Sequence, residues 1–143
     1  MGNFYMKPKL YFLLLAPVLL FASCTKWLPN PQQNIVGSWK IQSVERQTSY
    51  GGEHVYTGYE GGVFYFNNNG GAQYSDSYGQ MNGTWRLIPR SVDGTNSLEL
   101  RLYEYHNSDA IEWEFYSINT SGTRLIAYMN KYGNEYRYEF RRY

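Results

Sequence analysis

The side chains that could do chemistry in this chain of 143 residues are few, and their spacing does not favour a catalytic or metal site. Metal sites need several converging His, Cys or carboxylate ligands. The two histidines, His54 and His106, have no second histidine or cysteine at ligand spacing, and Glu53 is only a lone neighbour of His54. Glu112 and Glu114 could form a carboxylate pair for glycoside hydrolysis, but a solvated strand face is the favoured interpretation. No Gly-x-Ser-x-Gly or Walker sequence occurs. We expect no enzyme activity, no metal and no cofactor.

The first 23 residues have the parts of an export signal. Lys7 and Lys9 precede an apolar run over residues 10–21, and Ala22 and Ser23 follow it. That run would span about 18 Å as a helix, whereas the core of a bilayer is roughly 30 Å thick. Residues 1–23 are therefore predicted to be a signal peptide rather than a transmembrane helix.

The segment Phe21-Ala22-Ser23-Cys24 resembles the lipobox of bacterial lipoproteins, although Phe21 stands where leucine is usual. In that family the cysteine is acylated by fatty acids such as palmitate and becomes the first residue of the mature protein. The alternative is an ordinary signal peptide with a cysteine near its cleavage site. Cys24 is the only cysteine, so it has no partner for an internal disulfide. The resemblance implies that the chain is held on a membrane through lipidated Cys24.

Residues 24–33 are predicted to be a tether, because Pro29 and Pro31 favour an extended chain that reaches about 30 Å. No acidic run follows Cys24, and such a run marks export to the cell surface in some lipoproteins of Bacteroidetes. We therefore expect a protein of the cell envelope, anchored in the outer membrane and facing the periplasm.

Residues 34–143 are predicted to form one all-β domain. Turn signals such as Asn67-Asn68-Asn69-Gly70 recur every 10–14 residues, and no segment has a long helical stripe. The expected strands are eight in number and cover residues 35–45, 63–66, 72–77, 81–88, 96–105, 110–119, 123–130 and 135–143. Short connections between consecutive strands favour an antiparallel, up-and-down order.

The expected strands have one apolar side and one charged side. Ile111, Trp113 and Phe115 alternate with Glu112 and Glu114, and the same alternation recurs over residues 98–103 and 135–141. Eight strands with one buried side avoid exposed edges when the sheet closes into a barrel. Such a barrel is just wide enough for packed side chains or for one small ligand.

The segment Gly37-Ser38-Trp39-Lys40-Ile41, which Gly83-Thr84-Trp85 repeats in part, resembles the Gly-x-Trp opening of lipocalins and fatty-acid-binding proteins. Together with the lipobox and tether, the chain is similar to small lipocalin-like, calycin-type lipoproteins of Bacteroidetes. The resemblance implies an up-and-down barrel whose open end admits a small apolar molecule. It also implies that Trp39 plugs the closed end under a basic residue, Arg141 or Arg142. The domain is shorter than typical lipocalins and lacks their second motif.

Two functions remain open from the sequence. The first is binding of a small hydrophobic or amphipathic ligand inside the barrel. Its candidate lining residues are Phe64, Phe66, Trp113, Phe115, Tyr136 and Tyr138, with His54 and Tyr56 at the rim in a long Gly- and Tyr-rich loop over residues 48–60. The alternative is a filled barrel that binds a protein or glycan through surface aromatics, since the chain has 16 tyrosines.

Charge argues against nucleic acid as a partner. The sequence has 13 basic and 12 acidic side chains, and loss of the leader would remove Lys7 and Lys9, which leaves a net charge near −1. Nucleic-acid binding needs a basic patch, and we expect no such partner.

Overall fold

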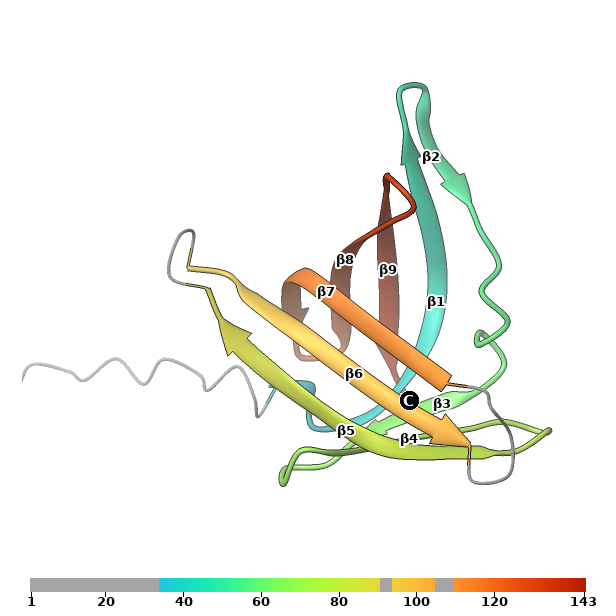
Figure 1. The fold of residues 1–143 in the computed structure, drawn as a ribbon, viewed down its shortest axis with the longest axis vertical. Coiled ribbons are helices and arrows are strands. Elements are labelled where there is room, and N and C mark those ends of the chain that lie inside the picture. The colour runs from blue at the N-terminus through green and yellow to red at the C-terminus, as the bar shows by residue number, and fades with distance from the viewer. Residues whose placement is uncertain (1–33, 91–93, 105–109) are drawn as a thin grey trace, which may run out of the picture.

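The structure is a computed structural model that describes residues 34–90, 94–104 and 110–143. The expected leader and tether, with Cys24, lie outside the described residues, as does His106. Within those ranges the chain forms nine strands (Figure 1), which are β1 Gly37–Thr48, β2 Gly51–His54, β3 Val63–Phe66, β4 Gly71–Ser75, β5 Gln80–Pro89, β6 Asn96–Glu104, β7 Ala110–Ser121, β8 Arg124–Lys131 and β9 Asn134–Arg142.

Eight of these strands close into a barrel. Neighbouring strands are antiparallel, and β1 pairs with β3 on one side and with β9 on the other, which closes the sheet. The predicted eight-stranded antiparallel up-and-down barrel, made of β1 and β3 to β9, is therefore confirmed. The additional strand β2 pairs with residues 45–48 of β1 and forms a hairpin that projects from the barrel (Figure 1). The segment 48–60, predicted to be a loop, thus includes a strand.

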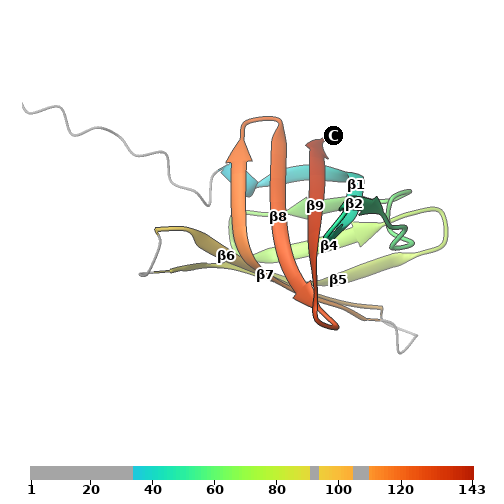
Figure 2. The same ribbon diagram turned by 90° about the horizontal axis from the view of Figure 1, so that it is seen from above.

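The sheet closes because two strands bend. The register of β1 against β9 shifts between Ile41 and Ser43, and such bulges bend a strand. The first part of β7 pairs with β6, whereas Ser117 to Ser121 pair with β8. Figure 2 shows β7 turning from the layer of β5 and β6 into that of β8 and β9.

Each Gly-x-Trp sequence has a structural reason for its glycine. Gly37 has a φ of 127°, which side-chain-bearing residues rarely adopt, and a Cβ there would contact the guanidinium of Arg142. A Cβ at Gly83 would overlap the carbonyl oxygen of Arg101 on β6. The tryptophan that follows, Trp85, is buried, and its indole N–H donates to the carbonyl of Asn67 (2.9 Å). Gly37 thus leaves room for the Arg142 guanidinium, and Gly83 lets β5 lie close to β6.

The predicted alternation sets the two faces of the barrel. Leu98, Leu100 and Leu102 of β6 are at most 1% exposed, and Trp113 and Phe115 of β7 also face inward. Side chains between them point outward, and many are charged.

The barrel has two distinct ends. Because consecutive strands are antiparallel, alternate turns meet at the same end. The closed end carries the β3–β4, β5–β6 and β7–β8 turns, the start of β1 and the end of β9. The mouth carries the β1–β2, β4–β5 and β8–β9 turns, together with the loop over residues 55–62 that leads into β3. The mouth is therefore the end opposite the start of the described chain.

Candidate functional site

The aromatic residues predicted to line a ligand cup form the core of the barrel. Phe64, Phe66 and Phe115 are at most 1% exposed, and Trp113 and Tyr138 are 8% and 5% exposed. Their rings touch one another, with centroids 5.5 Å apart for Phe64 and Trp113 and 5.2 Å apart for Phe115 and Tyr138. A side chain beside a water-sized void would keep some accessible surface. The centre of the barrel is thus filled around Phe64 and Phe115, which both contact Trp113 and Phe140.

Of the three remaining predicted ligand residues, one packs against this cluster and two lie outside it. Tyr136 is partly buried and packs against the edge of the core. His54 and Tyr56 are exposed, Tyr56 by 81%, and their rings meet edge to face with centroids 4.8 Å apart. His54 belongs to the projecting hairpin rather than to the barrel wall. The structure therefore brings Trp113, Phe115, Phe64, Phe66 and Tyr138 together and leaves His54 and Tyr56 outside.

Trp39 plugs the closed end, and Arg142 covers it. Trp39 is fully buried, and its indole N–H donates to the carbonyl of Ile35 (2.6 Å). The guanidinium of Arg142 lies 4.5 Å from the tryptophan ring. Arg141, the other candidate from the sequence, instead points outward and pairs with Glu139 (3.3 Å). The basic residue over Trp39 is Arg142, because its position in β9 turns it toward the end of the barrel.

A pocket of about 290 Å³ opens at the mouth. Its lining residues come from the 55–62 loop, the β4–β5 turn and the ends of β5 and β6; they are Tyr59, Tyr74, Asp76, Tyr78, Gly79, Gln80, Met81 and Glu104. Tyr74 and Met81 are buried and face each other across β4 and β5, so they form the apolar part of the pocket. The polar groups of Asp76, Gln80 and Glu104 supply its hydrogen-bonding part.

Tyr59 connects this pocket with the core. Its ring lies edge to face with Tyr74 (5.3 Å between centroids) and with Trp113 (5.6 Å). The loop that carries Tyr59 is attached at its start, where the Val55 N–H donates to the Val44 carbonyl (2.8 Å). The carboxylate of Glu60 then accepts hydrogen bonds from the backbone N–H groups of Thr57 and Gly58. Tyr59 is therefore held over Trp113 by a folded loop.

Hydrogen bonds favour the ionised form of two carboxylates at the mouth, Asp76 and Glu60. The backbone N–H of Tyr78 and the hydroxyl of Tyr74 both donate to Asp76 at 2.8 Å, and they hold its pKa below the usual range. Burial and the same bond to Asp76 raise the pKa of Tyr74. Burial alone would raise the pKa of Glu60, but its hydrogen bonds from Thr57 and Gly58 outweigh burial, and the pKa is lowered. The mouth thus places the neutral phenol of Tyr74 beside the negative carboxylate of Asp76.

The residues of this pocket were not predicted from the sequence as a site. One signal for it was present: Glu104 continues the inward side of β6 after Leu100 and Leu102, so an acidic residue follows an apolar series on the same side. It pairs in register with Met81. The contact of Tyr59 with Trp113 had no such signal, because it depends on the path of the 55–62 loop.

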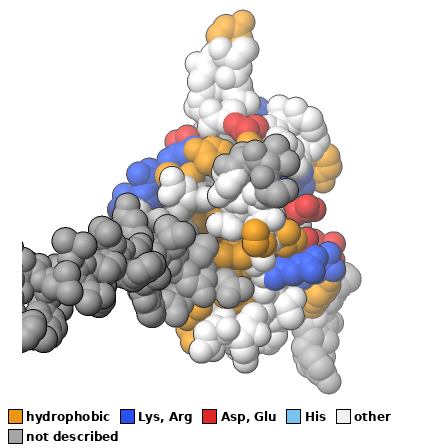
Figure 3. Space-filling model, turned by 90° about the vertical axis from the view of Figure 1, so that its left-hand side faces the viewer, with side chains coloured by type: hydrophobic (Ala, Val, Ile, Leu, Met, Phe, Trp, Pro, Cys, Tyr) orange, Lys and Arg blue, Asp and Glu red, His pale blue; other side chains and the backbone are white. Residues whose placement is uncertain are grey.

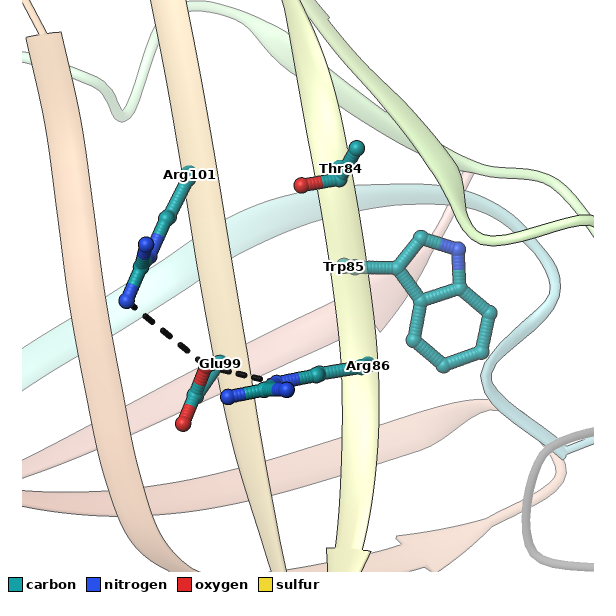
Figure 4. Close-up of a pocket in the computed structure, with 5 residues that line it drawn as sticks. All are labelled: Thr84, Trp85, Arg86, Glu99 and Arg101. Atoms are coloured by element: carbon teal, nitrogen blue, oxygen red, sulfur yellow. Dashed lines mark hydrogen bonds and ion pairs between the residues drawn. The ribbon is translucent and has the colours of Figure 1, made fainter.

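A second hollow, of about 240 Å³, lies on the outer face of β5 and β6 and is lined by Thr84, Trp85, Arg86, Glu99 and Arg101 (Figure 4). Figure 4 shows the side chain of Trp85 pointing away from Arg86 and Glu99. Arg86 pairs with Glu99 at 2.7 Å, and Arg101 lies 3.9 Å from the same carboxylate. These partners already satisfy Glu99, so we interpret the hollow as space between paired surface side chains. On the neighbouring strand, β7, Glu112 accepts a hydrogen bond from the hydroxyl of Tyr103 in β6 (2.8 Å).

Among residues 34–90, 94–104 and 110–143, no group of three or more His, Cys, Asp or Glu side chains is placed to hold a metal ion. Within the same ranges, no helix is both long and apolar enough to cross a bilayer.

Compared with protein-family models, with curated proteins and with solved structures, the chain has no match. What defines the class of protein is therefore the fold, a closed eight-stranded antiparallel barrel that is consistent with a lipocalin-like fold.

Proposed function

We propose that this protein is a lipid-anchored, lipocalin-like binding protein of the cell envelope, without enzyme activity, which binds a small amphipathic molecule at the mouth of its barrel. The observation that carries the proposal is the pocket of about 290 Å³ under Tyr59. Binding pockets combine apolar walls with a few polar groups that fix orientation. The mouth has this composition, with Tyr74 and Met81 beside Asp76 and Glu104.

The mouth is favoured over the centre of the barrel because the centre is filled. Phe64 and Phe115 have no exposed surface, and several rings would have to move before a ligand could reach them. Protein interiors are close-packed, and such a rearrangement is costly. A ligand at the mouth needs a smaller change, which is a shift of the Tyr59 ring from Trp113.

The charges of the mouth define the polar end of the ligand. Asp76 and Glu104 accept hydrogen bonds and carry negative charge, so they favour a hydroxyl or ammonium group and disfavour a carboxylate. The rings of Tyr59 and Tyr74 would pack against an apolar body of the ligand. We therefore expect octylamine to bind more tightly than octanoate.

Native mass spectrometry of the protein purified from its host membranes, followed by titration with octylamine, tests the proposal. We expect a co-purifying small molecule, and octylamine binding that Tyr59→Ala weakens by roughly fivefold to tenfold. The matched control is Tyr50→Ala, because Tyr50 lies at the tip of the β1–β2 hairpin and is 100% exposed. Absence of both the co-purifying molecule and octylamine binding would contradict ligand binding at the mouth.

The anchor is tested separately. If Cys24 carries the lipid, Cys24→Ala releases the protein from membranes. Unchanged membrane retention of this variant would refute lipidation at Cys24 and leave the mouth pocket unaffected.

A second candidate function is binding of a protein or glycan, and one observation favours it. Four tyrosines in turns or loops of the mouth are 81–100% exposed; they are Tyr50, Tyr56, Tyr78 and Tyr132. Tyrosine at such tips supplies contact area at low entropic cost. Replacing Tyr50 and Tyr132 by serine separates the two functions, because it would abolish partner binding and leave octylamine binding unchanged.

A further inference from the structure

Three basic side chains lie side by side across three strands on the outer face of the barrel. Arg141 of β9 is in register with Lys40 of β1 on one side and with Arg124 of β8 on the other. All three point outward, because their neighbours Trp39, Phe140 and Leu125 are buried. Like charges directly opposite each other on a sheet are destabilising. We refer to Lys40, Arg124 and Arg141 as the basic row.

One carboxylate serves two members of this row. Glu139 lies in the next position along β9 on the outer face and is only 7% exposed. It pairs with Arg124 (2.6 Å), with Arg141 (3.3 Å) and also with Arg137 (3.1 Å). The third member, Lys40, places its ammonium 4.0 Å from the ring of Tyr143. Arg137 has a second carboxylate partner, Glu45 (3.4 Å), but two negative charges do not balance Arg137 and the three cations of the basic row, which therefore keeps a positive field.

The basic row lies at the closed end, where the described chain begins. Arg142 fixes this arrangement, because its guanidinium donates to the carbonyls of Asn34 (2.9 Å), Val36 (3.0 Å) and Gly122 (2.7 Å). Figure 3 looks onto this end from the left of Figure 1 and shows Lys and Arg side chains in two places, at the upper left and at the right, with Asp or Glu side chains beside each. The segment that leads to Cys24 therefore joins the barrel next to the basic row.

The mouth has the opposite charge. Glu53, Glu60, Asp76, Glu104 and Glu135 all lie in loops, turns or strand ends at the mouth. Two basic residues also lie at this end: Arg46 is paired with Glu53, and the ammonium of Lys131 lies 5.2 Å from the ring of Tyr132. The barrel is thus positive where the tether begins and negative where the pocket opens.

We propose that the basic row docks on anionic lipid headgroups of the membrane that holds the anchor. This inference rests on the proposed lipidation of Cys24. A tether of ten residues reaches about 30 Å, well beyond the Debye length of about 8 Å at physiological salt, so the anchor alone does not fix the orientation of the barrel. Basic side chains near an anionic surface do so, and docking of this end turns the acidic mouth and its pocket away from the membrane.

The test measures orientation on vesicles with the acylated protein as isolated from its host. A donor dye is attached at Tyr50→Cys, at the tip of the mouth hairpin, and an acceptor dye is placed on lipid headgroups. On vesicles that contain phosphatidylglycerol, we expect low energy transfer at about 50 mM salt and higher transfer at about 0.5 M salt. On pure phosphatidylcholine, transfer is high at both salt concentrations.

The double variant Lys40→Glu/Arg141→Glu should give high energy transfer on both kinds of vesicle. Lys131→Glu, a control at the mouth, should keep the low transfer seen at low salt on vesicles that contain phosphatidylglycerol. The salt comparison needs no change in the basic row, so it holds even if the double variant folds poorly. Equal transfer on the two lipids in the unmodified background would overturn docking. Failure of the protein to float with vesicles at all would overturn the anchor, and with it this inference.

Discussion

Replacing Phe115 by alanine tests whether the barrel is filled. Phe115 has no exposed surface, and its ring lies against Trp113, Tyr138 and Phe140, with centroids 5.2–6.3 Å apart. For a close-packed site, lost burial and the cavity left behind make Phe→Ala cost about 3–5 kcal/mol. If the Phe115 ring lined an open ligand cup, it would already lack packing on one side, and its replacement by alanine would cost much less free energy of unfolding.

The assay is urea unfolding followed by circular dichroism, with the free energy taken from the midpoint and slope. Tyr65→Ala is the control, because Tyr65 of β3 is 44% exposed, and we expect it to cost less than about 1 kcal/mol. Benzene should raise the stability of Phe115→Ala, by occupying the new apolar cavity, and should leave the unmodified protein unchanged. A cost below about 1 kcal/mol for Phe115→Ala, or stabilisation of the unmodified protein by benzene, would refute the filled core.

Three further changes probe the closed end and the sheet. Arg142→Ala should lower the free energy of unfolding by about 2–3 kcal/mol, because it removes three hydrogen bonds and a cation–π contact. Arg142→Lys should recover only part of this free energy, because lysine lacks the planar guanidinium. Full recovery by lysine would contradict the guanidinium geometry as the cause. Gly83→Ala should cost about 3 kcal/mol or more in thermal unfolding, since its Cβ would overlap a carbonyl of β6, whereas Gly61→Ala, with open space around it, should be near neutral. The hydrogen bond from Arg124 lowers the pKa of Glu139. Its stabilising effect is therefore present above the unfolded pKa of about 4.3 and is lost as pH falls through the lower folded value. Stability should drop below about pH 4.5, and a Glu139→Gln variant with the same pH dependence would show that other groups cause it.

The strand order of this fold could be predicted from its sequence because each determinant is local. The turn residues 67–70 and 132–134 mark strand ends, and Gly70 and Gly133 have the positive φ that such turns need. The alternation around Trp113 decides which side of β7 is buried, since a one-residue slip would expose every apolar side chain of the strand.

Features that depend on chain segments far apart in sequence were not predictable in this way. The basic row joins residues 40, 124 and 141, so no basic run marks it in the sequence. The choice of Arg142 over Arg141 at Trp39 depends on how β9 ends against β1. The mouth pocket depends on the path of the 55–62 loop, which brings Tyr59 against Trp113. No periodic pattern in the sequence of this loop predicts that contact.

The central claim is that ligand binds at the mouth and not within the core, and two methionines report on these places separately. Met81 lines the mouth pocket, whereas Met129 is buried in β8, in register with Tyr136. In a titration of the ¹³C-methyl-methionine-labelled protein with octylamine, followed by NMR, the Met81 methyl signal should move and the Met129 signal should stay in place. Movement of Met129 with Met81 unchanged would contradict the claim and place the ligand inside the barrel.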